Sequence, residues 1–170
     1  MSKTNMKGTA VSNLEYTGIV TLSQCIRGKT FEVAKFHNAG GKSLFNFLAN
    51  CLVGDFELAR LTRPAKIMLL HEDVETRSIS KASNTSFIYL LSKPETVYSS
   101  ENKSIVRYSF IIPQDFFTGT SFNAIGLYTS EATEADLDSY AALVSNINFD
   151  DVNISISSIL ILDWELHISN

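Results

Sequence analysis

The chain has 170 residues, of which 45% are apolar, and its 14 basic and 18 acidic side chains give a formal charge of −4. This length suits one hydrophobic core, so we expect a single domain. Because the charges are spread without basic blocks, direct binding to DNA or RNA is not expected. No apolar run approaches the length of a membrane-spanning helix, and the polar first residues lack the core of a signal sequence.

Residues 1–13 have little to bury and predict a flexible or partner-bound arm, ahead of one β-sandwich domain over residues 14–170. Residues 15–22 and 30–37 are rich in Thr, Val, Ile, Phe and Tyr. Arg27-Gly28-Lys29 between them is typical of a turn, so we expect two strands joined by this turn.

One helix is indicated, over about residues 43–53. Ser43 is suited to be its N-cap, and Gly54 follows its end. Apolar side chains recur at helical spacing, at Leu44, Phe47, Leu48, Cys51 and Leu52. We expect this stripe to pack on a sheet or to close one end of the sandwich.

Strand patterns follow at residues 65–71, 86–92, 104–112 and 122–129. Gly126 in the last of these predicts a bulge or a close backbone approach. The polar connections over residues 71–85 and 93–103 are longer than hairpin loops, which makes them candidate contact surfaces.

Residues 133–147 fit two patterns. Thr133 and Asp136 are suited to cap a helix, whereas residues 139–149 also fit a strand ahead of an Asp150-Asp151 turn. We favour a short turn of helix followed by a strand.

The last strand pattern, residues 154–170, has the most regular alternation of apolar and polar side chains. The apolar side consists of Ile154, Ile156, Leu160, Leu162, Trp164, Leu166 and Ile168, and the polar side includes Asp163, Glu165 and His167. Such a strand needs a second layer over its apolar side. The predicted fold is therefore mainly β, an antiparallel β-sandwich with one α-helix packed on or capping the sheets.

A nucleotide site is the strongest chemical alternative. A strand, the residues Gly40-Gly41-Lys42-Ser43 and a helix follow one another as in a phosphate-binding loop, and Asp163 ends an apolar run as a magnesium ligand does. However, Phe36 occupies the position of the motif's first glycine, and such enzymes need a parallel sheet. We expect the two glycines to shape a strand-to-helix turn that Ser43 caps.

Other reactive side chains are dispersed. His37, His71 and His167 lack a second His or Cys at ligand spacing, so surface imidazoles are expected. Glu72-Asp73, Asp150-Asp151 with Asn153, and Asp163 with Glu165 are interpreted as solvated turns and a solvated strand face. We assign no catalytic residue, no cofactor-binding residue and no metal ligand, and we expect neither enzymatic activity nor a cofactor.

Three further side-chain groups have alternatives. Cys25 in a turn and Cys51 on the helix are expected to be reduced structural thiols. Phe116-Phe117 beside Gly119 forms either a binding patch or, as we favour, an anchor that tucks a loop under the sheet. Trp164 is expected in the core.

Five segments, in order, carry a resemblance: Tyr16-Thr-Gly-Ile-Val; Phe36-His-Asn-Ala-Gly-Gly-Lys-Ser-Leu-Phe with its helix and Gly54-Asp55; Pro64-Ala-Lys-Ile; Ala124-Ile-Gly-Leu-Tyr; and Ser158-Ile-Leu-Ile-Leu-Asp-Trp-Glu-Leu. This pattern, which covers nearly the whole chain, resembles small virion structural proteins of tailed bacteriophages. It is similar in particular to connector-ring and tail components of short-tailed phages, including crAss-like ones. The resemblance implies a β-sandwich repeated around a symmetry axis, with no catalytic residues.

The expected function is therefore a structural virion protein, assembled in the host bacterial cytoplasm. It would form a homo-oligomeric ring or adaptor in the neck or tail that joins portal, tail and fibre components. The alternative is a carbohydrate-binding β-sandwich module of a fibre or receptor-binding protein, with Phe116, Phe117 or Tyr98 as sugar platforms. A third alternative, the nucleotide hydrolase, would require ATP binding through Lys42.

Overall fold

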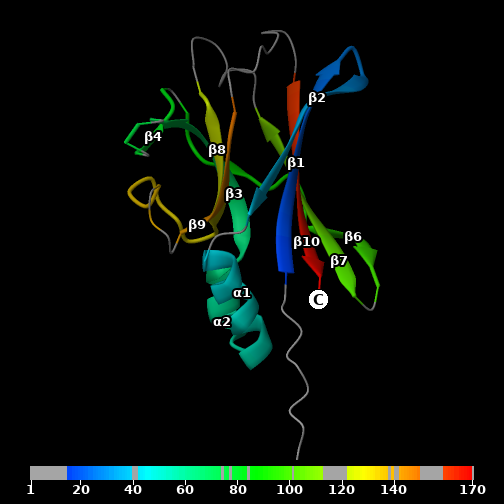
Figure 1. Ribbon diagram of the computed structural model, residues 1–170, viewed down its shortest axis with the longest axis vertical. Coiled ribbons are helices and arrows are strands. Elements are labelled where there is room, and N and C mark those ends of the chain that lie inside the picture. The colour runs from blue at the N-terminus through cyan, green and yellow to red at the C-terminus, as the bar shows by residue number, and fades with distance from the viewer. Residues whose placement is uncertain are drawn as a thin grey trace, which may run out of the picture.

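The computed structural model describes residues 15–39, 42–73, 75–76, 78–83, 85–100, 102–112, 122–137, 139, 142–149 and 159–169. Two antiparallel sheets and a pair of short helices make up the fold (Figure 1). The predicted mainly β, sandwich-like architecture is confirmed. The expected arm over residues 1–13 lies outside the described residues, as do Gly40, Gly41, Phe116, Phe117 and the Asp150-Asp151 turn.

Sheet A has the strand order β2-β1-β10-β7-β6. Its strands are β1 (Glu15–Ile26), β2 (Lys29–Ala39), β6 (Glu95–Ser99), β7 (Lys103–Ile112) and β10 (Ile159–Ser169). The turn at Arg27 and Gly28 joins β1 to β2, as expected, and both residues have positive φ. Both strands are longer than the sequence predicted, because their pairing continues up to this turn.

β10 lies in the middle of sheet A, paired along its length with β1 on one side and β7 on the other. Its apolar residues Leu160, Leu162, Trp164 and Leu166 are buried. The alternation predicted for this segment is thus confirmed over residues 159–169, whereas residues 154–158 lie outside the described part. Trp164 belongs to the core, as expected.

Sheet B has the order β4-β3-β8-β9, with β5 also paired to β3. Its strands are β3 (Pro64–Glu72), β4 (Ile79–Lys81), β5 (Ile88–Tyr89), β8 (Ala124–Thr129) and β9 (Leu143–Asn148). The main core lies between the sheets, where Ile67 and Leu127 join the cluster around Trp164. Phe36 and Phe149, with ring centroids 5.3 Å apart, pack where β2 approaches β9.

The other side of sheet B has a smaller core of its own. Met68 and Tyr128 are buried there with Leu137 and Ala142 from the segment between β8 and β9. Lys66, only 4% exposed, points into the same layer and donates hydrogen bonds to the carbonyls of Ser130 and Ala132. Both faces of β3 are therefore covered, which explains its continuous apolar sequence.

Gly126 permits the close approach that the sequence predicted. A Cβ added there would lie 2.5 Å from Cε2 of Tyr128. The Tyr128 hydroxyl donates a hydrogen bond to the Leu137 carbonyl at 2.8 Å, which holds the ring in place. The β8–β9 pairing also shifts between Leu127 and Tyr128, so a strand irregularity accompanies the close contact.

The helices form a hairpin beyond one end of the two sheets (Figure 1). α1 (Lys42–Val53) is the expected helix, but it begins at Lys42, so Ser43 lies inside it rather than at the N-cap; α2 (Phe56–Thr62) was not predicted. Asp55 caps α2 by accepting a hydrogen bond from the Leu58 N–H at 3.0 Å.

The expectation that the whole apolar stripe of α1 packs on the sandwich is wrong. Leu44 is buried and Leu48 packs against the core, but Cys51 and Leu52 are exposed. The reason is length, because the second half of α1 extends past the end of the sheets (Figure 1).

Several strand predictions also need correction. Residues 86–92 form only the two-residue strand β5, because Leu90 donates to Ala65 of sheet B and Leu91 to Ser109 of sheet A, so the chain crosses between the sheets here. The two expected polar connections contain the short edge strands β4 and β6. Cys25 lies in β1 rather than in a turn.

The ambiguous segment near residue 133 is resolved for its described part. The strand is confirmed as β9. Residues 133–137 form hydrogen-bonded turns rather than a regular helix: Asp136 accepts hydrogen bonds from both the N–H and the hydroxyl of Thr133, at 2.8 and 2.6 Å, and the N–H of Ser139 donates to the Asp136 carbonyl.

Candidate functional site

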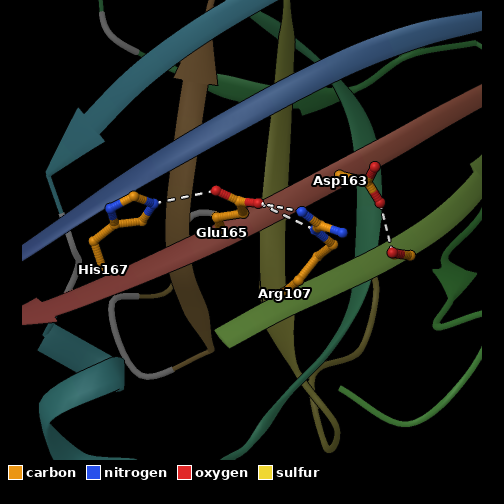
Figure 2. A network of polar contacts seen from close by, with 5 residues as sticks. Arg107, Asp163, Glu165 and His167 are labelled. Carbon is orange, nitrogen blue, oxygen red and sulfur yellow. Dashed lines mark hydrogen bonds and ion pairs between the residues drawn. The ribbon is translucent and has the colours of Figure 1, made fainter. Parts of the chain in front are cut away.

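Polar side chains meet on the outer face of sheet A, the face turned away from sheet B (Figure 2). The β10–β7 register places Glu165 opposite Arg107 and Asp163 opposite Ser109. Arg107 donates from Nε and Nη2 to Oε1 of Glu165, at 3.1 and 2.7 Å. The other oxygen of Glu165 lies 3.2 Å from Nε2 of His167, and the Ser109 hydroxyl donates to Asp163.

This group is partly buried, so the expectation of a solvated strand face is wrong. The side chain of Glu165 is 22% exposed and that of His167 is 14% exposed. The expectation that His167 is a surface imidazole is therefore also wrong. Apolar neighbours cause the burial, because Ile19 of β1 lies opposite Glu165 and Ile105 of β7 lies opposite His167.

The electrostatics favour the charged pair. Burial alone raises the pKa of Glu165, but hydrogen bonds from Arg107 and His167 outweigh it and hold the pKa below its ordinary value. The hydrogen bond to Glu165 in turn raises the pKa of Arg107, against the opposing effect of burial. The contact between Arg107 and Glu165, which we call the clamp, is a charge-assisted pair of hydrogen bonds that stabilises the register of β7 against β10.

The geometry contradicts the layout of a phosphate-binding loop. β2 ends at Ala39 and α1 begins at Lys42, as that layout requires, yet every strand pair in both sheets is antiparallel. Asp163 is engaged by Ser109. Within the described ranges no three His, Cys, Asp or Glu side chains are grouped to hold a metal ion.

The remaining sequence candidates lie apart from this cluster. His37 and His71 are exposed, as expected. Asp73 accepts hydrogen bonds from the N–H groups of Thr76 and Glu75, which lower its pKa, so this exposed acid shapes a turn. Glu72, in contrast, is buried and contacts Asn146 rather than lying in a solvated turn.

A second surface, missed by the sequence analysis, is the tip of the helical hairpin, which we define as Leu52, Val53 and Phe56. These side chains are 87%, 77% and 76% exposed. They flank Gly54, whose positive φ of 77° lets the chain reverse between the helices. Three large apolar side chains this exposed within five residues are typical of an interaction site. The signal for it was present in the sequence, because Asp55 is an N-cap residue and predicts a second helix here.

The edges of sheet A do not offer an equivalent surface. β2 exposes the charged Lys29, Glu32 and Lys35, and its pairing with β1 is interrupted by a bulge. β6 is short and its pairing with β7 is also bulged. Exposed charges and bulges at a sheet edge disfavour strand-to-strand association. The hairpin tip is therefore the better candidate for contacts with other chains.

No family model, no curated protein and no solved structure matches the chain. Among the described residues, neither helix has the length and apolar character needed to span a membrane.

Proposed function

We propose that the protein is a structural virion subunit of a tailed bacteriophage, which forms a homo-oligomeric ring or adaptor in the neck or tail and joins portal, tail and fibre components. The observation that supports the proposal is the exposed hairpin tip. Leu52, Val53 and Phe56 present apolar surface that an isolated soluble chain gains nothing by exposing. The phage assignment itself rests on the sequence resemblance.

The clamp on sheet A suits such a role. Arg107 and Glu165 join β7 to β10, which stabilises the sheet from which contacts with neighbouring subunits would be made. In this proposal the protein acts by holding other virion components in position, and the hairpin tip contacts a neighbouring protein in the assembly.

Light scattering coupled to size exclusion, over a range of protein concentrations, tests the self-association. We expect a mass above that of one 18.8 kDa chain that holds on dilution. Mass spectrometry of purified phage particles tests the location, and we expect the chain to be present in many copies. A monomer at every concentration that is also absent from particles contradicts the proposal.

The carbohydrate-binding alternative named three aromatic side chains, of which Tyr98 lies among the described residues. Tyr98 is half-exposed on the edge strand β6. An exposed aromatic ring is suited to stack on a sugar. Glycan-array binding that disappears in Tyr98→Ala, but not in the adjacent Val97→Ala, would favour this alternative over the structural role.

A further inference from the structure

A hollow of about 200 Å³ lies near the base of the helical hairpin, where α2 ends and β3 begins. It is lined by Arg63, Pro64, Leu90, Ser92, Lys93 and Pro94, and we call it the basal hollow. Its wall is apolar where the prolines and Leu90 lie, and cationic at Arg63 and Lys93. In the part of the chain that the structure describes, neither cation forms an ion pair.

The size of the basal hollow fits one aromatic ring, since an apolar cavity of about 150 Å³ is sufficient to bind benzene. Phe56 at the hairpin tip presents such a ring, 76% exposed and with both acidic neighbours, Asp55 and Glu57, beside it in the sequence. An aromatic side chain with flanking acids matches a hollow with flanking cations in both shape and charge.

We propose that the hairpin tip of one copy docks in the basal hollow of a second copy, with Phe56 as the anchor. The ring would contact Pro64, Pro94 and Leu90, and the guanidinium of Arg63 is placed to pack on its face. Glu57, which forms an exposed ion pair with Arg60 at 3.4 Å within its own chain, approaches Lys93, and Leu52 and Val53 cover the rim. This inference rests on the proposed function, because it names the contact through which the subunits assemble.

Tip and hollow are different surfaces of one chain, so the contact is heterologous. Repetition of a heterologous contact links copies head to tail and gives a ring where the rotation closes. Two-fold pairing would instead require the two contacts to form reciprocally within one pair of copies, each tip in the hollow of the other.

Two variants, each defective in one surface, test the docking. Phe56→Ser removes the anchor but leaves the hollow, and Arg63→Glu combined with Lys93→Glu reverses the hollow's charge but leaves the tip. All three side chains are exposed, so we expect both variants to fold. We expect each variant alone to be monomeric at concentrations where the wild type assembles beyond two copies, with a dissociation constant at least about tenfold higher.

Mixing the two variants gives the decisive result. The charge-reversed variant keeps an intact tip, which can enter the intact hollow of Phe56→Ser. The hollow of the charge-reversed variant and the tip of Phe56→Ser are both defective, so no second contact forms. We therefore expect a 1:1 heterodimer that grows no further. Phe31→Ser and Lys35→Glu, which alter an exposed aromatic and an exposed cation on β2, are the matched controls and should assemble as the wild type does.

Light scattering separates the outcomes. A wild type that assembles while either variant keeps the wild-type mass overturns the docking and leaves the proposed function standing. A mixture that stays monomeric, or a wild type that stops at two copies, overturns the head-to-tail contact. A wild type that is monomeric throughout overturns the docking, and if the chain is also absent from purified phage particles the proposed function is contradicted as well.

Discussion

Arg107 on β7 donates two hydrogen bonds to one carboxylate oxygen of Glu165, its direct partner on β10. The two residues are separated by 58 positions in the sequence and are brought together only by the sheet register. Because the pKa of Glu165 is lowered in the folded chain, the ion pair adds a pH-dependent contribution to the stability of this strand pair.

Glu165→Gln should lose a stabilising contribution that varies with pH. The pKa of Glu165 lies below its ordinary value of 4.5 in the folded chain, so its contribution is present above that value and is lost as the pH falls through the lowered pKa. We expect the variant to be less stable by about 1 kcal/mol at pH 7, because both side chains are partly exposed. The deficit should shrink towards zero in acid.

Urea unfolding between pH 7 and pH 3, followed by the fluorescence of Trp164, measures this difference. Glu32→Gln on the exposed edge strand β2 lies opposite Ser23 rather than Arg107; it is the control and should leave the stability nearly unchanged. A deficit of Glu165→Gln that is the same at every pH would contradict the ion-pair explanation.

Gly126→Ala should destabilise the protein by about 1–3 kcal/mol, because the new methyl group would overlap the ring of Tyr128. A double-mutant cycle identifies the cause. In a Tyr128→Ala background the ring is absent, so the same glycine substitution should cost much less. An equal cost in both backgrounds would assign the effect to the backbone instead.

Leu162→Ala and Ile161→Ala are adjacent substitutions on opposite faces of β10. Leu162 is fully buried between the sheets, so its truncation should cost about 2–5 kcal/mol in unfolding free energy. Ile161 is only partly buried on the outer face, and we expect a cost of about 1 kcal/mol or less. Similar costs at both positions would show that the outer face is also covered in solution.

Lys66→Met removes a buried ammonium group. Burial lowers the pKa of Lys66, with the charge of Asp136 opposing the shift. Because the folded chain then binds this proton less readily than the unfolded chain, the Lys66 contribution to stability rises as the pH increases towards the ordinary value of 10.5. In chemical unfolding experiments, we expect the unfolding free energy of the wild type to rise relative to that of the variant between pH 8 and pH 10. A difference in unfolding free energy that does not change with pH would show that Lys66 has no unusual pKa.

The sequence was informative where a strand or helix buries one face. β10 and β7 have alternating apolar residues because sheet B covers one side of each, and this alternation predicted both strands. Edge strands lack that constraint. All five residues of β6 are exposed, so no periodicity marked it.

The candidate surfaces were harder to predict because each depends on position in the fold. Leu52 continues the apolar stripe of α1 and differs from the buried Leu44 only in lying beyond the end of the sheets. Glu165 and His167 alternate with apolar residues as solvent-facing side chains do, but Ile19 and Ile105 on neighbouring strands partly cover them. Cross-strand neighbours of this kind are unknown until the register is known.

The central position of β10 in sheet A also affects when this sheet can fold. Ser169 pairs with Glu15, so the middle of sheet A is filled by a strand that is synthesised after both of its neighbours, β1 and β7. While the ribosome is still adding those residues, β1 and β7 have a gap between them where β10 belongs. Sheet A therefore closes only after translation has passed residue 169, so a chain that stops before β10 leaves β1 and β7 unpaired on these sides.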